Sequence, residues 1–323
     1  MESAGGDESI PAGDFSKGEG AMAVDAMPGA ASAGGRIDRW AVTGWKFALP
    51  GLSVIGIVMG FPLGYAVLLA ISSFTLLHPR LSPLVGFENF AAVMADQYFW
   101  HSVWLTIQYS SFTVIGEFLL GLVVALMLNR VVRLKAVYFA ILTIPMAMSP
   151  VSVALIWHML LQPNLGIINR LFEAVGHPGF DWLGGPSLAF WTVVFVDVWQ
   201  QVSFVILILA AGLASLPKEP FEAAEVDGAG ELQQFWYLTL PMLRPIASIA
   251  IIIQLINEFR TYDLVYVLTK GGPGIATDLL SYFAYKRAFL GLSINEGSAA
   301  SFALLFMVLA LTVVFFRIVT RRA

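Results

Sequence analysis

Long apolar runs separated by short polar stretches dominate the chain from residue 46 onward. Six of these runs are long enough to cross about 30 Å of hydrocarbon as helices of about 20 residues. They cover residues 46–74, 103–128, 136–161, 187–213, 246–269 and 298–317. The pattern predicts an all-α polytopic membrane protein with six transmembrane helices.

The composition agrees with a membrane protein and excludes several other classes. Apolar residues make up 58% of the 323 residues and charged residues 12%, whereas soluble domains average about 45–50% and about 25%. The chain has no cysteine and its four histidines are scattered, so neither a disulfide nor a metal site is expected. No basic cluster indicates nucleic-acid binding.

Residues 1–35 differ from the rest of the chain. They contain six acidic residues and one basic residue, are rich in Gly, Ala and Ser, and show no apolar periodicity. This composition predicts a disordered acidic tail on the cytoplasmic side, followed by one transmembrane domain over residues 36–323.

Lysine and arginine near the ends of the apolar runs predict the orientation. With the amino terminus inside, the inner segments carry 11 of these residues and the outer segments carry 6. The bias predicts that both termini are cytoplasmic. It also places the loop over residues 214–245, between the fourth and fifth helices, on the cytoplasmic side.

This loop has the pattern of two short helices joined by a turn. Pro220 suits a first helical position, and the following residues are good helix formers. Gly228 and Gly230 permit a turn, and an amphipathic segment over 231–240 leads into the fifth transmembrane helix. A rigid knob of this kind is suited to fit a cleft on a cytoplasmic partner. The alternative is a helical hairpin that binds nothing.

Two motifs carry a resemblance to a known family. Glu222-Ala223-Ala224, three further residues, Gly228, nine residues, Leu238 and then Leu240-Pro241 resemble the EAA loop of ABC importer permeases, with Leu238 where that family has Ile. The stretch 259–274 is similar to a stretch of sugar and polyol permeases. Over about residues 40–320 the chain resembles the carbohydrate-uptake, maltose-type branch.

The resemblance implies a transmembrane permease subunit that forms half of a pathway for a sugar, oligosaccharide or sugar alcohol in a bacterial plasma (inner) membrane. It implies four partners besides the membrane lipid and that solute: a second homologous permease, two copies of a cytoplasmic ATPase and an extracytoplasmic solute-binding protein. The chain lacks a GxxxxGK[ST] phosphate loop, so we expect no enzyme activity and no cofactor of its own. ATP and Mg²⁺ are expected in the ATPase. The residues implied in ATPase coupling are Glu222, Ala223, Ala224, Asp227, Gly228, Leu240 and Pro241.

Polar groups inside the apolar runs are candidates for the substrate pathway, because burying them in lipid is costly. The fifth run is the strongest candidate, since residues 254, 257, 258 and 261 share one helix face. Counted from Ile246, Asn257 lies about 17 Å and Arg260 about 21 Å along the helix, around and just beyond the membrane midplane. The candidates are Glu117, Asp197, Trp199, Gln200, Gln201, Asn257, Glu258, Arg260, Thr261, Tyr262 and Asp263.

Several alternatives stay open at this point. Arg260 and Asp263, three residues apart, could pair with each other, and Glu117 could bond to a neighbouring helix. The outer segment over 270–297 either receives the binding protein or lies on the bilayer. Glycerol-3-phosphate or another polar solute is an alternative cargo. An ion-coupled carrier, with Glu117, Asp197 and Glu258 as relay groups, or a scaffold that transports nothing, is an alternative function.

Overall fold

The computed structural model describes residues 45–81, 83–130 and 133–320, and the predicted tail over 1–35 lies outside them. Contacts divide the chain into two units, residues 1–61 and 62–323. The described part of the first unit is helical and includes the π-helical turn η1 (Gly56–Gly60). The packing and the site described below concern the second unit, which begins within α2 (Phe61–Ala70).

The prediction of an all-α polytopic membrane protein is confirmed. Five helices of the described residues are long and apolar enough to cross a membrane, and a bent helix pair brings the number to six if it counts as one span. The five are Trp45–Ala70, Gln97–Arg130, Pro186–Ala214, Glu231–Phe259 and Ile294–Arg317.

The third predicted span is not one straight helix. It consists of α5 (Lys135–Ala147) and α6 (Pro150–Leu160), which meet at an angle of 93°. Pro150 starts α6, and Ser149 before it has an extended backbone with ψ 136°. A residue that precedes proline is biased away from the helical region, and the extended Ser149 is the point where the helix breaks.

The fifth predicted span also differs from the expectation. It begins at α10 (Glu231–Gln234), continues through the π-helical turn η2 (Phe235–Thr239) and ends with α11 (Leu240–Phe259). A separate helix, α12 (Asp263–Leu268), follows after a break of three residues. The continuous helix predicted over 246–269 is therefore wrong, because Tyr262, at φ −131° and ψ −52°, leaves the helical region.

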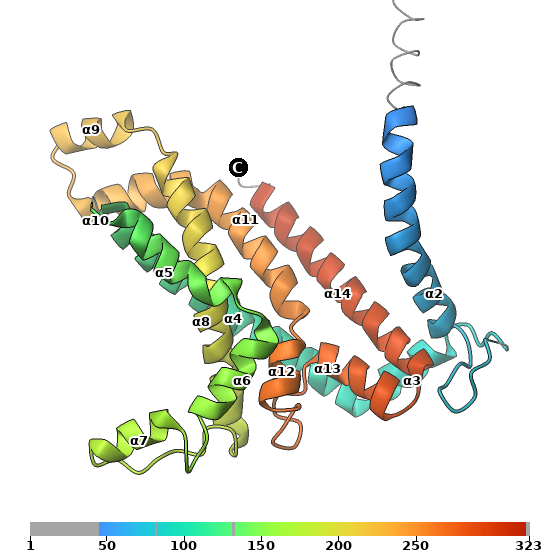
Figure 1. The fold of residues 1–323 in the computed structure, drawn as a ribbon. Coiled ribbons are helices and arrows are strands. Elements are labelled where there is room, and N and C mark those ends of the chain that lie inside the picture. The colour runs from blue at the N-terminus through green and yellow to red at the C-terminus, as the bar shows by residue number, and fades with distance from the viewer. Residues whose placement is uncertain (1–44, 82, 131–132, 321–323) are drawn as a thin grey trace, which may run out of the picture. The chain divides into compact units, whose positions relative to one another are not determined.

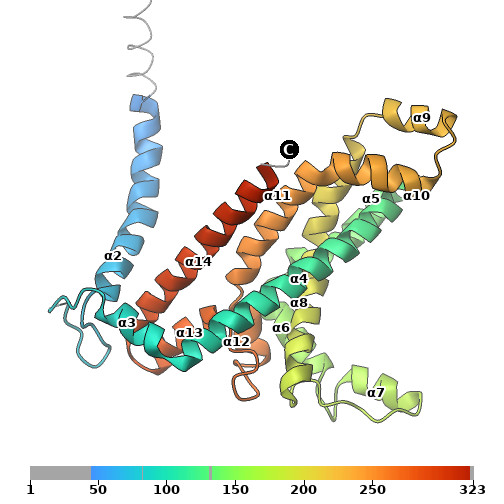
Figure 2. The same cartoon turned by 180° about the vertical axis from the view of Figure 1, so that it is seen from behind.

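Three long helices form the centre of the bundle: α4 (Gln97–Arg130), α8 (Pro186–Ala214) and α11 (Figures 1 and 2). They approach closely at small residues. A Cβ on Gly121 of α4 would lie 2.7 Å from Val205 Cγ1, and one on Gly212 would lie 2.9 Å from Ile246 Cγ2. Since real Cβ atoms do not come this close, glycine permits the observed packing.

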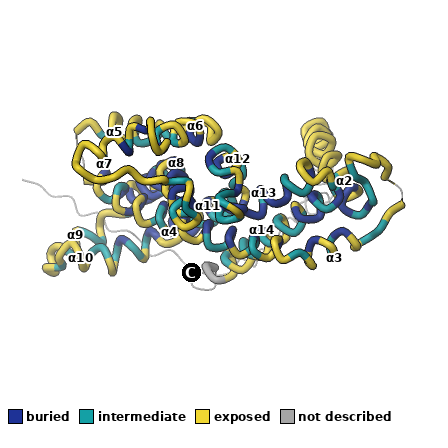
Figure 3. Tube along the Cα trace, turned by 90° about the horizontal axis from the view of Figure 1, so that it is seen from below, coloured by how far each residue is buried: buried dark blue, intermediate teal, exposed yellow. Residues whose placement is uncertain are grey.

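The remaining elements lie at the two ends of the bundle. At one end α9 (Glu219–Val226) and α10 form a hairpin between α8 and α11 (Figure 1). At the other end lie the short helices α3 (Glu88–Ala95), α7 (Ile167–Ala174), α12 and α13 (Leu280–Tyr285). After α13 the chain forms the π-helical turn η3 (Lys286–Leu290) and then the long helix α14 (Ile294–Thr320). Burial is concentrated along the central helices, whereas α7, α9 and α10 are largely exposed (Figure 3).

Candidate functional site

The hairpin between α8 and α11 is closed by a specific backbone turn. Gly228 has φ +80°, in the left-handed region that only glycine adopts readily. Its N–H donates to the Glu225 carbonyl (3.0 Å), and the Ala229 N–H donates to the Ala224 carbonyl (2.9 Å). These two bonds form a Schellman motif, which ends α9 and reverses the chain toward α10.

The outward surface of this hairpin is formed by α9, which has no buried residue. Val226 at its end is 88% exposed. Four of the predicted coupling residues, Glu222, Ala223, Asp227 and Gly228, are exposed here, and Ala224 is half-buried. The other two predicted coupling residues, Leu240 and Pro241, lie at the start of α11, beyond the η2 turn.

The hairpin is attached firmly to the bundle at both ends. Leu216 before it and Phe235 after it pack against the apolar cluster that joins α4, α8 and α11. Arg130, at the end of α4, donates to Glu231 Oε2 of α10 over 2.9 Å. A groove of about 1300 Å³ lies between the hairpin and the ends of α4 and α8. The residues that flank the hairpin are thus packed against the spanning helices.

Three predicted pathway residues from three different spans converge in one buried cluster. Glu117 of α4 and Glu258 of α11 are fully buried, and Asp197 of α8 is nearly so. The Tyr109 hydroxyl donates a hydrogen bond to the Asp197 carboxyl group. None of the ion pairs among the described residues involves these three carboxyl groups. The bond from Tyr109 to Asp197 joins α4 to α8, whereas both carboxyl oxygens of Glu258 are buried without a hydrogen-bond partner in the part of the chain that the structure describes.

A short chain of hydrogen bonds leads from this cluster toward the surface of α11. Gln254 Nε2 donates to Glu117 Oε2 over 2.7 Å, and Asn257 Nδ2 donates to Gln254 Oε1 over 3.2 Å. Gln254 is buried, whereas Asn257 is only half-buried. The expected alternative that Glu117 bonds to a neighbouring helix is therefore observed, with Gln254 of α11 as the donor. Gln254 in turn orients the side chain of Asn257.

The predicted polar residues of α8 have separate environments. Gln200 is buried, and its Nε2 donates to the Met148 carbonyl at the bend between α5 and α6 (3.1 Å). Gln201 is half-buried, whereas Trp199 is exposed and packs edge-on against Trp157 at 5.4 Å. Gln200 therefore supports the bent span, and Trp199 is an aromatic surface close to it.

The break after α11 and the start of α12 contain the remaining pathway candidates of the fifth predicted span. Arg260 and Asp263 are exposed, and no ion pair joins them in the described part of the chain. Thr261 and Tyr262 are half-buried. The Tyr262 ring stacks on Tyr266 at a centroid distance of 5.4 Å. Of the four residues predicted to share one helix face, Gln254 and Glu258 are buried, whereas Asn257 and Thr261 are half-buried.

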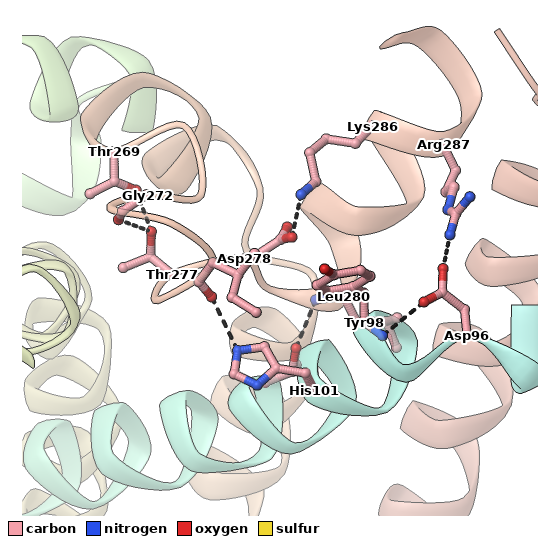
Figure 4. A network of polar contacts seen from close by, with 12 residues as sticks. Asp96, Tyr98, His101, Thr269, Gly272, Thr277, Asp278, Leu280, Lys286 and Arg287 are labelled. Carbon is pink, nitrogen blue, oxygen red and sulfur yellow. Dashed lines mark hydrogen bonds and ion pairs between the residues drawn. The ribbon is translucent and has the colours of Figure 1, made fainter. Parts of the chain in front are cut away.

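The segment after α12 is folded into the bundle by a polar network (Figure 4). Asp278 pairs with Lys286, and Arg287 pairs with Asp96 at the start of α4. The Leu280 N–H donates to Thr106 Oγ1 of α4 over 2.8 Å. Because α13 buries four of its six residues, it belongs to the core of this end rather than lying apart on the bilayer. Burial raises the pKa of Asp278 above its usual range, and the hydrogen bond from the lysine opposes this shift.

Sequence reasoning missed several residues of these clusters. Tyr109 and Thr113 share one face of α4 with Glu117, since they occur at intervals of four residues. That spacing was visible in the sequence. The Asp278–Lys286 pair was not, because it joins a loop to a π-helical turn.

Comparison with known proteins gives the family. Residues 117–321 match the model of the binding-protein-dependent transport system inner membrane component. The trehalose/maltose transport system permease protein MalF of Thermococcus litoralis is 34% identical over 280 residues, which are 87% of this chain and 94% of the relative. The sn-glycerol-3-phosphate transport system permease protein UgpA of Salmonella typhimurium is 35% identical over 241 residues, 74% of this chain and 81% of the relative.

The fold matches a solved importer. A crystal structure of a bacterial ABC transporter involved in the import of the acidic polysaccharide alginate aligns with a TM-score of 0.77 at 21% identity, covering 89% of this chain and 98% of that chain. The prediction of an ABC importer permease fold and the resemblance to ABC importer permeases are both confirmed. The chain belongs to the family of binding-protein-dependent transport system inner membrane components.

Proposed function

We propose that this inner-membrane permease forms half of the pathway for a sugar, oligosaccharide or sugar alcohol and is driven through the α9 hairpin. A second homologous permease would complete the pathway, two copies of a cytoplasmic ATPase would supply the force, and an extracytoplasmic binding protein would deliver the solute. ATP and Mg²⁺ would be bound by the ATPase, with no catalytic site or cofactor in this chain. Both termini and the hairpin would be cytoplasmic.

The observation that carries this proposal is the exposed α9 hairpin, fixed at both ends to the central helices. Leu216 and Phe235 pack against the cluster that joins α4, α8 and α11. Closure of an ATPase dimer that grips α9 would therefore move α8 and α11 together. These two helices also carry Asp197 and Glu258 of the buried cluster, so the same movement would reach the middle of the span.

Substrate contact is proposed at the edge of α11, where Asn257 and Thr261 are half-buried. Amide and hydroxyl groups match the hydroxyl groups of a sugar, and an aromatic ring stacks on its apolar face. Further residues proposed to contact the substrate are Trp199, Gln201, Arg260, Tyr262 and Asp263. Inside the bundle, four buried residues are proposed to hold these contact residues in place: Glu117, Asp197, Gln200 and Glu258.

The identity of the cargo is supported by the relatives, which are named for trehalose and maltose, sulfoquinovosyl glycerol and sn-glycerol-3-phosphate. One feature favours an anionic cargo as a second candidate. Arg260 is exposed and forms no ion pair with the other described residues, so its guanidinium group could bind a phosphate.

Uptake in sealed proteoliposomes that contain this permease, the second permease and the two ATPase copies, with the loaded binding protein outside, tests this proposal. Radiolabelled maltose and sn-glycerol-3-phosphate serve as the two probes. We expect uptake to require ATP and Mg²⁺ inside the vesicles and to be insensitive to a protonophore. Uptake without internal ATP that a protonophore abolishes would support the ion-coupled carrier instead. No uptake of either probe, with ATPase activity unchanged by the loaded binding protein, would contradict the proposed cargo.

A further inference from the structure

The segment between α6 and α8, residues 163–185, folds on itself into a compact foot. Its centre is Asn169 of α7, which is buried. Asn169 Nδ2 donates to the carbonyl oxygens of Pro163 (3.0 Å) and Phe180 (2.8 Å), and its Oδ1 accepts from Trp182 Nε1 over 2.7 Å. Phe172 packs against Phe180 at 5.3 Å. These contacts make the foot a structured element rather than a loose connection.

The foot nevertheless exposes a continuous apolar strip. Ile167 and Leu171 lie on one face of α7, and Val175, which caps the helix, follows at the same spacing of four residues. Their exposed fractions are 56%, 63% and 74%, and Leu165 just before them is 70% exposed. Leaving this much contiguous apolar surface in water is unfavourable, so such a strip is normally covered.

The position of the foot indicates what covers the strip. The segment leaves the bilayer where α6 ends at Leu160 and returns where α8 begins at Pro186, at the end of the bundle opposite α9 (Figures 1 and 2). Both helices that adjoin the foot also expose large apolar side chains near these ends, Met159 on α6 and Trp191 on α8. The strip thus adjoins two apolar helices of the kind that a membrane covers.

The depth also fits a lipid surface. Tryptophan is enriched at the interface between hydrocarbon and headgroups, and Trp191 lies five residues inside α8. At a rise of 1.5 Å per residue, the start of α8 stands about 8 Å beyond that level. Interfacial amphipathic helices bury their apolar face by about 5–10 Å at this boundary. The foot joins this end of α8 and therefore lies close to the headgroup region, within reach of the leaflet for an interfacial helix such as α7.

The chemistry of the strip favours lipid over a protein partner. The strip consists of Leu, Ile and Val, whereas the energetically dominant residues of protein interfaces are Trp, Tyr and Arg. Arg170 and Glu173 are exposed on other faces of α7. Arg170 can extend to lipid phosphates while the apolar strip stays in the acyl region.

We propose that the strip of Leu165, Ile167, Leu171 and Val175 inserts into the lipid leaflet at this end of the bundle. The foot then anchors the adjoining ends of α6 and α8 at a fixed depth. This inference is independent of the cargo and of the coupling hairpin.

Spin-label accessibility in vesicles tests the insertion. The chain has no cysteine, so Leu171→Cys, Val175→Cys and, on another face of α7, Glu173→Cys each provide a single labelling site. Each labelled permease is reconstituted with its partner subunits into vesicles of phosphatidylethanolamine and phosphatidylglycerol. The ratio of accessibility to oxygen and to a water-soluble nickel complex is then measured at each label.

We expect oxygen to be favoured at Leu171 and Val175 and the nickel complex to be favoured at Glu173. Two strip positions are used so that poor incorporation of one variant does not decide the result. Preference for the nickel complex at both strip positions would place the strip in water and overturn the proposal. Exclusion of both reagents at the strip would show that protein covers it and would also overturn the proposal.

Discussion

Replacing Gly228 by alanine tests whether the shape of the hairpin drives transport. Gly228 has φ +80°, and a Cβ added there would meet nothing within 4 Å. The substitution therefore adds no clash, and its cost comes from the backbone alone. A left-handed conformation costs an L-residue about 1–2 kcal/mol. That cost falls on the two hydrogen bonds that end α9.

A shift of this size lowers the ratio of the closed turn, in which both hydrogen bonds are formed, to the open turn by a factor of about 5–30. If the closed turn is the form that docks on the ATPase, the rate of ATP-driven uptake falls by up to the same factor. Gly230→Ala is the matched control, because Gly230 has φ −71° and ψ 162°, and a Cβ there also meets nothing within 4 Å. Gly228→Asn should retain more uptake than Gly228→Ala, since asparagine tolerates the left-handed region better.

The assay is the initial rate of uptake in proteoliposomes, divided by the amount of permease in the membrane. We expect Gly230→Ala to match the unmodified protein, Gly228→Asn to be intermediate and Gly228→Ala to be lowest. Equal rates for Gly228→Ala and Gly230→Ala would refute the reasoning from backbone conformation. So would an asparagine variant as slow as the alanine variant.

Three further predictions concern the pathway, the packing and the polar network. Asn257→Leu and Thr261→Val should lower the ATPase rate that loaded binding protein stimulates without lowering the basal rate; unchanged stimulation would contradict the proposed contact. Gly121→Ala should destabilise the bundle by about 1–3 kcal/mol, seen as a lower Tm, because its Cβ would lie 2.7 Å from Val205 Cγ1; an unchanged Tm would show that the helices separate freely. Burial raises the pKa of the Asp278 carboxyl group in the folded protein. The protonated group therefore stabilises the fold fully below its unfolded pKa of about 3.9, and this stabilisation is lost as pH rises through the folded pKa. The Tm of the unmodified protein should therefore fall relative to that of Asp278→Asn between acidic and neutral pH, and the opposite slope would contradict this assignment.

Local signals predicted much of the architecture. Apolar runs located the spans, and the spacing from Glu222 to Pro241 indicated the hairpin with Gly228 at its turn. The bend in the third span was also accessible, because a residue before proline, here Ser149, favours an extended backbone.

Other features depended on packing between distant segments. The break after Phe259 contains neither proline nor glycine, so nothing local marks the end of α11. Glu117 and Gln254 are 137 residues apart and meet only because α4 and α11 pack together. Periodicity placed Gln254, Asn257, Glu258 and Thr261 on one helix face, but it could not show that the buried Gln254 supports the half-buried Asn257.

Crosslinking from the tip of α9 in the complete importer tests the coupling role most directly. Val226→Cys places a single thiol at a position that is 88% exposed, in a chain that has no cysteine of its own. A thiol-anchored photocrosslinker at this position should join the permease to the ATPase subunit, whereas the same reagent at Val175→Cys, at the opposite end of the bundle, should not. A Val226 adduct that contains no ATPase, or a Val226 thiol that an impermeant reagent labels from outside intact cells, would contradict the account.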